Sequence, residues 1–431
     1  EGTKANAWKL MQALGITGVN ENNLAIVLEL IAATNDDGSQ ISSPAALQTL
    51  VTQSLVGASL NIIRDFGESA SNPAPTLAEY QHIGITTLNS AQVDGFNTFI
   101  GPLTVAATDT VSEVSNLAQV YLSVLSTAAG QSASPALSET NIATLGITGV
   151  TADNLAAVLA AIAATANDGS AVDTKAELQA IVTAAVNAFT AAVTTVSGYD
   201  GSNTAPSTAT YAAAGVSGVT STNLTTINSV VAVLDATATD SAQDIQAIVH
   251  AYNQLLGGAD GVNNSQPALS TAQYQLLGLT SVDTQVETNL LNDAIDVMGT
   301  SAVDSQSDLA NLARIVQGIM DTANGTTASP ALTATDLALL GLTGVTADNL
   351  NAILAAIAAT ANEGTGVDSL SELQAIVTAA NLSYTQAVTD LSQYSGSGTA
   401  PTTDTWNLAG VEGVTGTNLN VVNTYLAAAG S

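Results

Sequence analysis

Residues 340–380 read LGLTGVTADNLNAILAAIAATANEGTGVDSLSELQAIVTAA, and this segment contains the clearest helix pattern in the chain. Its apolar side chains recur at the i, i+3, i+4, i+7 spacing of one helix face, at Leu350, Ile353, Leu354 and Ile357. The pattern has no strand-like alternation. We therefore expect a helix near 347–361 with Thr346 as its N-cap, and an equivalent helix near 152–166.

A second, longer helix is expected to follow. Ser369-Leu370-Ser371-Glu372 has the form of a capping box, in which the hydroxyl and the carboxylate each bond a free backbone N–H group. Equivalent caps are expected at Thr110, Thr174 and Ser305, and at Ser43, which is followed by Pro44. A short helix carrying Leu337 and Leu340 precedes Gly341. The unit therefore contains three helices.

The unit is repeated along the chain. An apolar-Gly-apolar triplet recurs along the chain, and the number of residues between successive triplets takes either a shorter or a longer value. Its glycine is Gly15, Gly84, Gly146, Gly215, Gly278, Gly341 and Gly410. Self-similarity at a nearly fixed period indicates an array of small structural modules. Six complete copies and one partial copy are predicted: 1–74, 75–136, 137–206, 207–268, 269–331, 332–401 and 402–431, hereafter copies 1 to 7. Proline and small polar residues mark the boundaries between them.

The runs AGVSGVTSTNL (214–224) and residues 340–380 resemble the bacterial GA and GA-like modules, which are three-helix bundles found in tandem on large cell-surface proteins. The resemblance covers all six complete copies. It implies an all-α tandem array of three-helix bundles that forms an elongated rod, and a location on the cell surface. In the family's albumin-binding members the second helix and its flanks carry aromatic and basic contacts. The corresponding positions here are Ala347, Asp348, Asn349 and Asn351, so the resemblance implies a fold rather than that ligand.

Composition restricts the functional classes. The chain has 36 acidic and 5 basic residues, a net charge of −31 and no cysteine. Nucleic-acid binding is not expected, because phosphate neutralisation needs clustered Lys and Arg. Apolar runs are shorter than the eighteen or more residues of a membrane span, so none is expected. Few lysines, no cysteine and abundant Thr, Ser, Asn, Asp and Gly are typical of exported bacterial surface proteins, and we expect an extracellular or cell-surface location.

Acidic loops between the second and third helices are the one candidate for metal binding. They contain Asp36 and Asp37, Asp168 and Asp173, and Glu363 and Asp368. Calcium prefers six to eight oxygen ligands, which such loops could supply in part. Asn, Asp and Gly are also ordinary turn formers, and copies 2, 4 and 5 lack the full pattern. A solvated loop without a cofactor is the favoured interpretation, and Ca²⁺ is the alternative.

Other distinctive residues favour structure over catalysis. His82 and His250 lie at unrelated positions and are expected at the surface or half-buried, not as ligands or catalysts. Trp8, Tyr80, Tyr211, Tyr274 and Trp406 all fall in first helices, where we expect them to pack at the junctions between copies. No Ser-His-Asp or Cys-His grouping recurs, so no enzymatic activity is expected.

The sequence therefore predicts a structural stalk of an exported bacterial surface, adhesion or matrix protein, with contacts mainly within copies and between neighbours. Its partners would be other protein chains or a surface or matrix component. Two alternatives remain: a self-assembling filament or surface-layer subunit, and a multivalent array of protein-binding modules.

Overall fold

The computed structural model describes residues 6–35, 37–165, 169–264, 267–360 and 364–429. Over these ranges it contains α-helices, four short 3-10 helices and no β-strand, apart from an isolated antiparallel bridge between Asp260 and Gly299. The prediction of an all-α chain is confirmed. The chain forms two compact units, unit 1 (residues 1–191) and unit 2 (residues 192–431).

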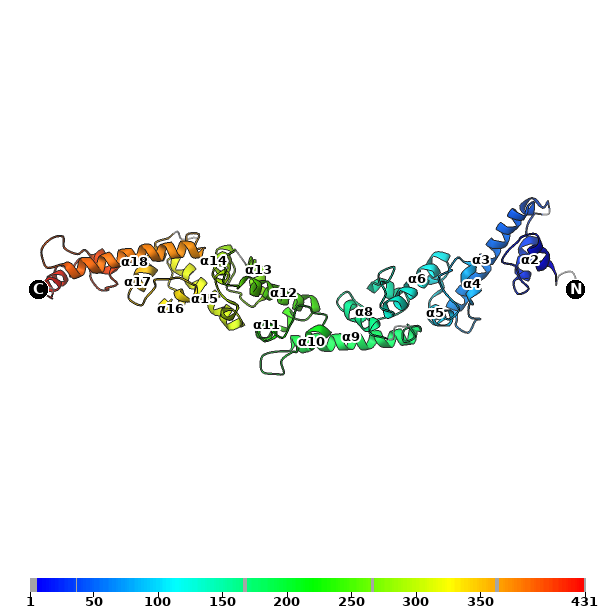
Figure 1. Cartoon of the computed structure of the whole chain (residues 1–431), viewed down its shortest axis with the longest axis horizontal. Helices are drawn as coiled ribbons and strands as arrows, with labels where there is room; N and C mark the ends of the chain where they lie inside the picture. The colour runs from blue at the N-terminus through cyan, green and yellow to red at the C-terminus, as the bar shows by residue number, and fades with distance from the viewer. Residues whose placement is uncertain (1–5, 36, 166–168, 265–266, 361–363, 430–431) are drawn as a thin grey trace. The chain divides into compact units, whose positions relative to one another are not determined.

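In unit 1, two shorter helices precede each long helix, and Figure 1 shows the long α3 beside α2 at one end and beside α4 at the other. The helices are α1 (Ala7–Ala13), α2 (Leu24–Ala32), α3 (Pro44–Glu68), α4 (Leu77–His82), α5 (Val93–Ile100), α6 (Val111–Ala128), α7 (Glu139–Thr144), α8 (Leu155–Ala163) and α9 (Lys175–Ser197), with 3-10 helices η1 (Ser39–Ile41) and η2 (Val105–Ala107). The C-terminal end of α9 belongs to unit 2.

Unit 2 has the same order of helix lengths. Its helices are α10 (Thr208–Ala213), α11 (Leu224–Val231), α12 (Ala242–Gly258), α13 (Thr271–Leu276), α14 (Gln285–Asp296), α15 (Gln306–Ala323), α16 (Ala334–Leu339), α17 (Leu350–Ala358), α18 (Leu370–Gln393), α19 (Thr403–Leu408) and α20 (Leu419–Ala429), with 3-10 helices η3 (Ala236–Ala238) and η4 (Thr300–Ala302). Figure 1 shows α18 alongside α17, and the two helices are in contact.

Side-chain caps determine where the long helices begin. Glu113 N donates to Thr110 Oγ1 over 3.2 Å, and Thr110 N donates to the Glu113 carboxylate over 3.0 Å, so both halves of a capping box are present. Hydroxyl caps lie at the five predicted positions, Ser43, Thr110, Thr174, Ser305 and Ser369. Helix length also explains the alternating period: α3, α9 and α18 have 25, 23 and 24 residues, whereas α6, α12 and α15 have 18, 17 and 18.

The second helices are shorter than predicted. α17 covers Leu350–Ala358 instead of 347–361, and α8 covers Leu155–Ala163 instead of 152–166. Thr346 is not the N-cap, because its N–H donates to Asn349 Oδ1 over 2.7 Å and the Asn349 Nδ2 donates to Gly344 O over 2.8 Å. These side-chain bonds hold residues 344–349 in a turn and compete with the helical bonds of an earlier start.

The core of unit 1 has two parts. The N-terminal cluster consists of Met11, Ile16, Val19, Leu24, Val27, Val51 and Leu55. The second cluster begins at Ile63 and Phe66 in α3 and continues through α4 to α9, as far as Ala185. Phe96 and Phe99 belong to this cluster, and both are fully buried. Since α3 contributes to both clusters, one continuous helix joins them.

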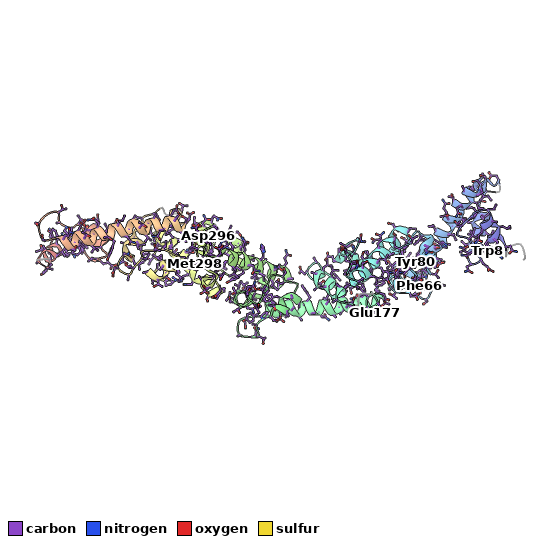
Figure 2. All side chains as sticks on the ribbon, in the orientation of Figure 1. Trp8, Phe66, Tyr80, Glu177, Asp296 and Met298 are labelled. Carbon is purple, nitrogen blue, oxygen red and sulfur yellow. The ribbon has the colours of Figure 1, made fainter. Side chains whose placement is uncertain are left out.

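In unit 2 one large cluster extends from Val230 to Ala380 and includes side chains of α11 to α18. Met298, labelled in Figure 2, belongs to it. A small C-terminal cluster, defined by Leu391, Trp406 and Val414, lies where α18 meets α19 and α20. The core of unit 2 is therefore continuous across the predicted copy boundaries at 268 and 331.

Two described helices, α3 and α9, are long and apolar enough to cross a bilayer by length and composition alone. α3 contacts α2 and α4, and α9 supplies Leu178 and Val182 to the core of unit 1. The expectation that the chain has no membrane span stays a prediction.

Candidate functional site

The part of the chain that the structure describes shows no metal site built from the acidic loops. Asp36, Asp168 and Glu363 lie outside the described residues. Of the other three predicted candidates, Asp37 belongs to copy 1, Asp173 to copy 3 and Asp368 to copy 6. The described residues contain no group of three or more His, Cys, Asp or Glu side chains placed to hold a metal ion. The described residues thus offer Ca²⁺ no cluster of carboxylates, and Ca²⁺ binding stays a hypothesis.

Each of the described loop carboxylates takes part in local hydrogen bonding or in the electrostatics of its neighbours. Asp37 Oδ1 accepts from Ser39 N over 2.9 Å, and bonds from the Ser39 backbone and side chain lower the pKa of Asp37. Bonds from Thr174 and then from Asp173 lower the pKa of Glu177. These are the interactions of a solvated turn and a helix cap.

Asp368 lies at a hollow of unit 2, a pocket of about 310 Å³. Its lining residues are Pro267, Ala268, Asn289, Asn292, Asp293, Asp368 and Ser369. Asp368 Oδ2 accepts from Asn289 Nδ2 over 3.3 Å, and Asp293 Oδ2 accepts from Leu370 N over 3.2 Å. Burial raises the pKa of Asp293, and the Asp296 and Asp368 carboxylates raise it further. The oxygen atoms of this pocket thus serve mainly to join α14 to the start of α18.

An aromatic-asparagine pair, buried in copies 2, 4 and 7 and partly buried in copy 5, joins the first and second helices. Tyr80, Tyr211 and Tyr274 donate their hydroxyls to the Oδ1 atoms of Asn97, Asn228 and Asn292 over 2.6, 2.8 and 2.7 Å, and Trp406 Nε1 donates to Asn423 Oδ1 over 2.9 Å. Each asparagine also donates Nδ2 to the carbonyl nine residues before the motif glycine, in Pro75, Pro206, Leu269 and Pro401, over 2.7 to 2.9 Å. The asparagine therefore joins its own helix to the first helix and to the segment just before that helix, which in copies 4 and 7 ends the preceding copy.

The aromatic side chains were expected at junctions between copies, and the structure corrects this in part. The Tyr80 hydroxyl bonds within its own copy, while its ring lies in the cluster that also holds Phe66 of the preceding α3; Figure 2 labels both residues in unit 1. Trp406 has the same register, four residues before the motif glycine. Trp8 lies three residues earlier in its copy and packs half-buried against the N-terminal cluster. Burial raises the pKa of Tyr80, of Tyr211 and of Tyr274.

Sequence reasoning missed these asparagines, although a signal was present. Copies 2, 4, 5 and 7 have an aromatic residue in the first helix and an asparagine at the matching place in the second helix. At the same two positions copies 1, 3 and 6 have Met11 and Leu28, Ile142 and Leu159, and Leu337 and Leu354. The two positions change together from copy to copy: an aromatic residue with an asparagine is replaced by two aliphatic residues. Such paired changes are expected of side chains in contact.

A second set of bonds runs between successive copies. Lys175 N donates to Thr98 Oγ1 over 2.8 Å, Gln306 N donates to Ser229 Oγ over 2.9 Å, and Leu370 N donates to Asp293 Oδ2 over 3.2 Å. In every case the donor is the first residue of a long helix and the acceptor lies in the second helix of the preceding copy, 77 residues earlier. The bond satisfies an N–H group that a helix N-terminus leaves free. An ion pair between Arg314 of α15 and Asp336 of α16 adds a further link.

The histidines lie where they were expected. His250 is exposed, and His82 is half-buried with its Nδ1 3.0 Å from Ser59 Oγ.

Comparison with family models, curated proteins and solved structures found no match to this chain. Evidence on function therefore comes from the chain's own geometry.

Proposed function

We propose that this chain is a non-enzymatic structural region of an exported bacterial cell-surface, adhesion or matrix protein. In this proposal the copies are GA-like three-helix bundles in tandem, and the array is an elongated stalk that sets a distance. Its contacts are those of a repeat protein, in which each module packs on its immediate neighbours.

The bonds at a 77-residue spacing are the main support. They link the second helix of one copy to the third helix of the next, and each uses a polar side chain of the earlier copy at one register. The distinctive aromatic-asparagine pairs likewise join backbone segments. A chain whose unusual residues recur as bonds between segments and between copies is suited to resist a pulling force along its length.

Small-angle scattering on the full chain tests this proposal. A compact protein of 431 residues would have a radius of gyration of about 22 Å. We expect a value well above this, and an internal duplication of residues 207–331 should lengthen the particle in proportion to the added copies. A radius near the compact value, or a duplication that thickens the particle without lengthening it, contradicts the stalk.

The second candidate is a self-assembling filament or surface-layer subunit. Exposed apolar side chains favour it: Leu14 is 61% and Tyr425 is 75% exposed. The net charge of −31 opposes association until salt or Ca²⁺ screens it. Light scattering during titration with NaCl and with CaCl₂ separates the two candidate functions. Growth of the particles into ordered polymers requires a subunit role, whereas a constant particle size fits the stalk.

A further inference from the structure

The core of unit 1 is divided inside the long helix α3. Leu55 belongs to the N-terminal cluster, whereas Ile63 belongs to the second cluster. Residues 56–62, hereafter the linking segment, lie between them and form about two turns of helix. Ser59 is the only buried residue of the linking segment. Copies 1 and 2 are therefore joined by a part of α3 that contributes little to either core.

The junctions that follow copies 2, 4 and 5 have no such segment. The second cluster of unit 1 continues from copy 2 into copy 3, and the large cluster of unit 2 continues through copies 4, 5 and 6. Each of these junctions also has a bond from the first residue of a long helix, Lys175, Gln306 or Leu370. Between copies 1 and 2 the described residues make one hydrogen bond, from Ser59 Oγ to His82 Nδ1 over 3.0 Å, and α3 packs on α4 and α5. The junction between copies 1 and 2 thus depends on α3 itself.

Gly57 lies in the linking segment, where nothing requires a glycine. A Cβ atom added to it would meet no atom within 4 Å. Gly67 of the same helix differs, because a Cβ atom there would lie 2.7 Å from Thr108 Oγ1. Glycine in a helix interior is less favourable than alanine, since its backbone has more conformational freedom to lose. Gly57 therefore weakens α3 at the point where the helix has the least packing.

The position of Gly57 has different surroundings in the shorter and the longer third helices. Counted from the N-cap residue, the corresponding side chains of α6, α12 and α15 are all fully buried: Val124, Leu255 and Ile319. In α9 and α18 the corresponding residues are Ala188 and Ser383, and both are exposed. The middle of each longer helix thus faces solvent, and α3 is the one with glycine at this position.

We propose that the linking segment of α3 is a hinge, with Gly57 as its pivot, about which copy 1 bends relative to copy 2. This goes beyond the proposed stalk function and does not depend on it. Sharp bends in helices occur at pairs of glycine and serine, and Gly57 with Ser59 is such a pair. The bond between Ser59 and His82 holds the C-terminal side of the hinge on α4, and Leu55 holds the other side in the N-terminal cluster. The bend is therefore confined to the turn between Leu55 and Ser59.

The hinge is tested on the full chain by measuring distances between two spin labels with pulsed electron paramagnetic resonance. The chain has no cysteine, so two introduced cysteines carry the only labels. The first pair, Ala45→Cys in α3 and Gln119→Cys in α6, lies on the two sides of the hinge. The reference pair, Gln119→Cys and Ala184→Cys in α9, lies in copies 2 and 3, which share one core cluster. All three residues are exposed. We expect the distance distribution of the first pair to be about twice as wide as that of the reference pair.

A second variant locates the pivot. Gly57→Ala should narrow the first distribution to the width of the reference pair, because alanine favours the helix and makes no new contact there. In the same variant, amide hydrogen exchange over residues 56–62 should slow by about fivefold, which corresponds to the difference in helix propensity between glycine and alanine. Gln53→Ala is the matched control, because Gln53 is exposed in the adjoining turn of α3 and lies outside the linking segment. It should leave both the distance distribution and the exchange unchanged.

Two outcomes overturn the proposal. Equal widths for the two label pairs in the chain with native Gly57 show that copies 1 and 2 move as one rigid body. A wide first distribution that Gly57→Ala does not narrow places the bending outside the linking segment.

Discussion

The Tyr211 hydroxyl donates to Asn228 Oδ1 over 2.8 Å in the buried space between α10 and α11, and Asn228 Nδ2 donates to Pro206 O. Neither side chain can be removed without leaving a partner unsatisfied. An unpaired buried polar group costs about 1 to 3 kcal/mol.

The first prediction follows from this pair. Asn228→Leu leaves the Tyr211 hydroxyl and the Pro206 carbonyl without partners and should lower the free energy of unfolding by about 2 kcal/mol or more. Adding Tyr211→Ile reproduces the aliphatic pair that copy 3 carries at Ile142 and Leu159. The double variant should be less destabilised than the sum of the single variants by about 1 kcal/mol, as measured by urea unfolding. Strict additivity would show that the two side chains act independently.

The bond between copies is tested at Ser229. Ser229→Ala removes the acceptor for Gln306 N and should cost about 0.5 to 2 kcal/mol, the usual range for loss of a helix cap. Thr424→Ala is the matched control, because Thr424 has the same register but caps no long helix among the described residues. The control should change stability by less than about 0.5 kcal/mol. Equal losses of stability for the two variants would show that the loss arises within α11 and α20 and not from the bond between copies.

The third prediction concerns pH. Burial alone would raise the pKa of Asp336, but bonds from Thr333 and the charge of Arg314 outweigh it and lower the pKa. The folded state therefore binds the proton less readily than the unfolded state, so this stabilisation is present above the unfolded pKa and is lost as pH falls through the folded value. Arg314→Gln should destabilise the chain at pH 7 by about 1 kcal/mol and by less at pH 3, measured as urea midpoints. A loss that is independent of pH would contradict the pairing.

The fourth prediction tests the apolar stripe of α17. Ile357 is fully buried, so Ile357→Asp should cost several kcal/mol, on the order of the stability of a small domain. Ala358→Asp is the control, because Ala358 is the next residue of α17 and its side chain is exposed. Thermal unfolding followed by circular dichroism should show a lower midpoint for the first variant only. Similar midpoints would mean that the side chain of Ile357 lies in solvent.

The local signals were read correctly from the sequence. Helix type followed from the apolar spacing in Leu350 to Ile357, and the starts of the long helices followed from hydroxyl caps such as Thr110 and Ser369. Both depend on residues within one or two turns, where spacing alone specifies the neighbour. The predicted start of α17 was wrong because Asn349 and Thr346 bond each other outside the helix, and propensity does not reveal which of two competing bonds forms.

The longer-range contacts were not predicted. Asn97 and Tyr80 are 17 residues apart, and Thr98 and Lys175 are 77 residues apart. Such pairs depend on how helices pack, which no local pattern encodes. Comparing the copies position by position, as with Ile142 and Leu159 against Tyr211 and Asn228, was the signal within the sequence that could have found the first kind of pair.

The unequal size of the core clusters has a mechanical consequence. In unit 2 a single cluster runs from Val230 to Ala380, whereas the clusters around Met11 and around Trp406 contain only a few buried side chains each. If the chain is pulled from its two ends, copies 1 and 7 should give way at low force, and the interlocked helices α11 to α17 should yield together in a later, larger step. The copies with small clusters would then extend first and leave the large cluster of unit 2 folded.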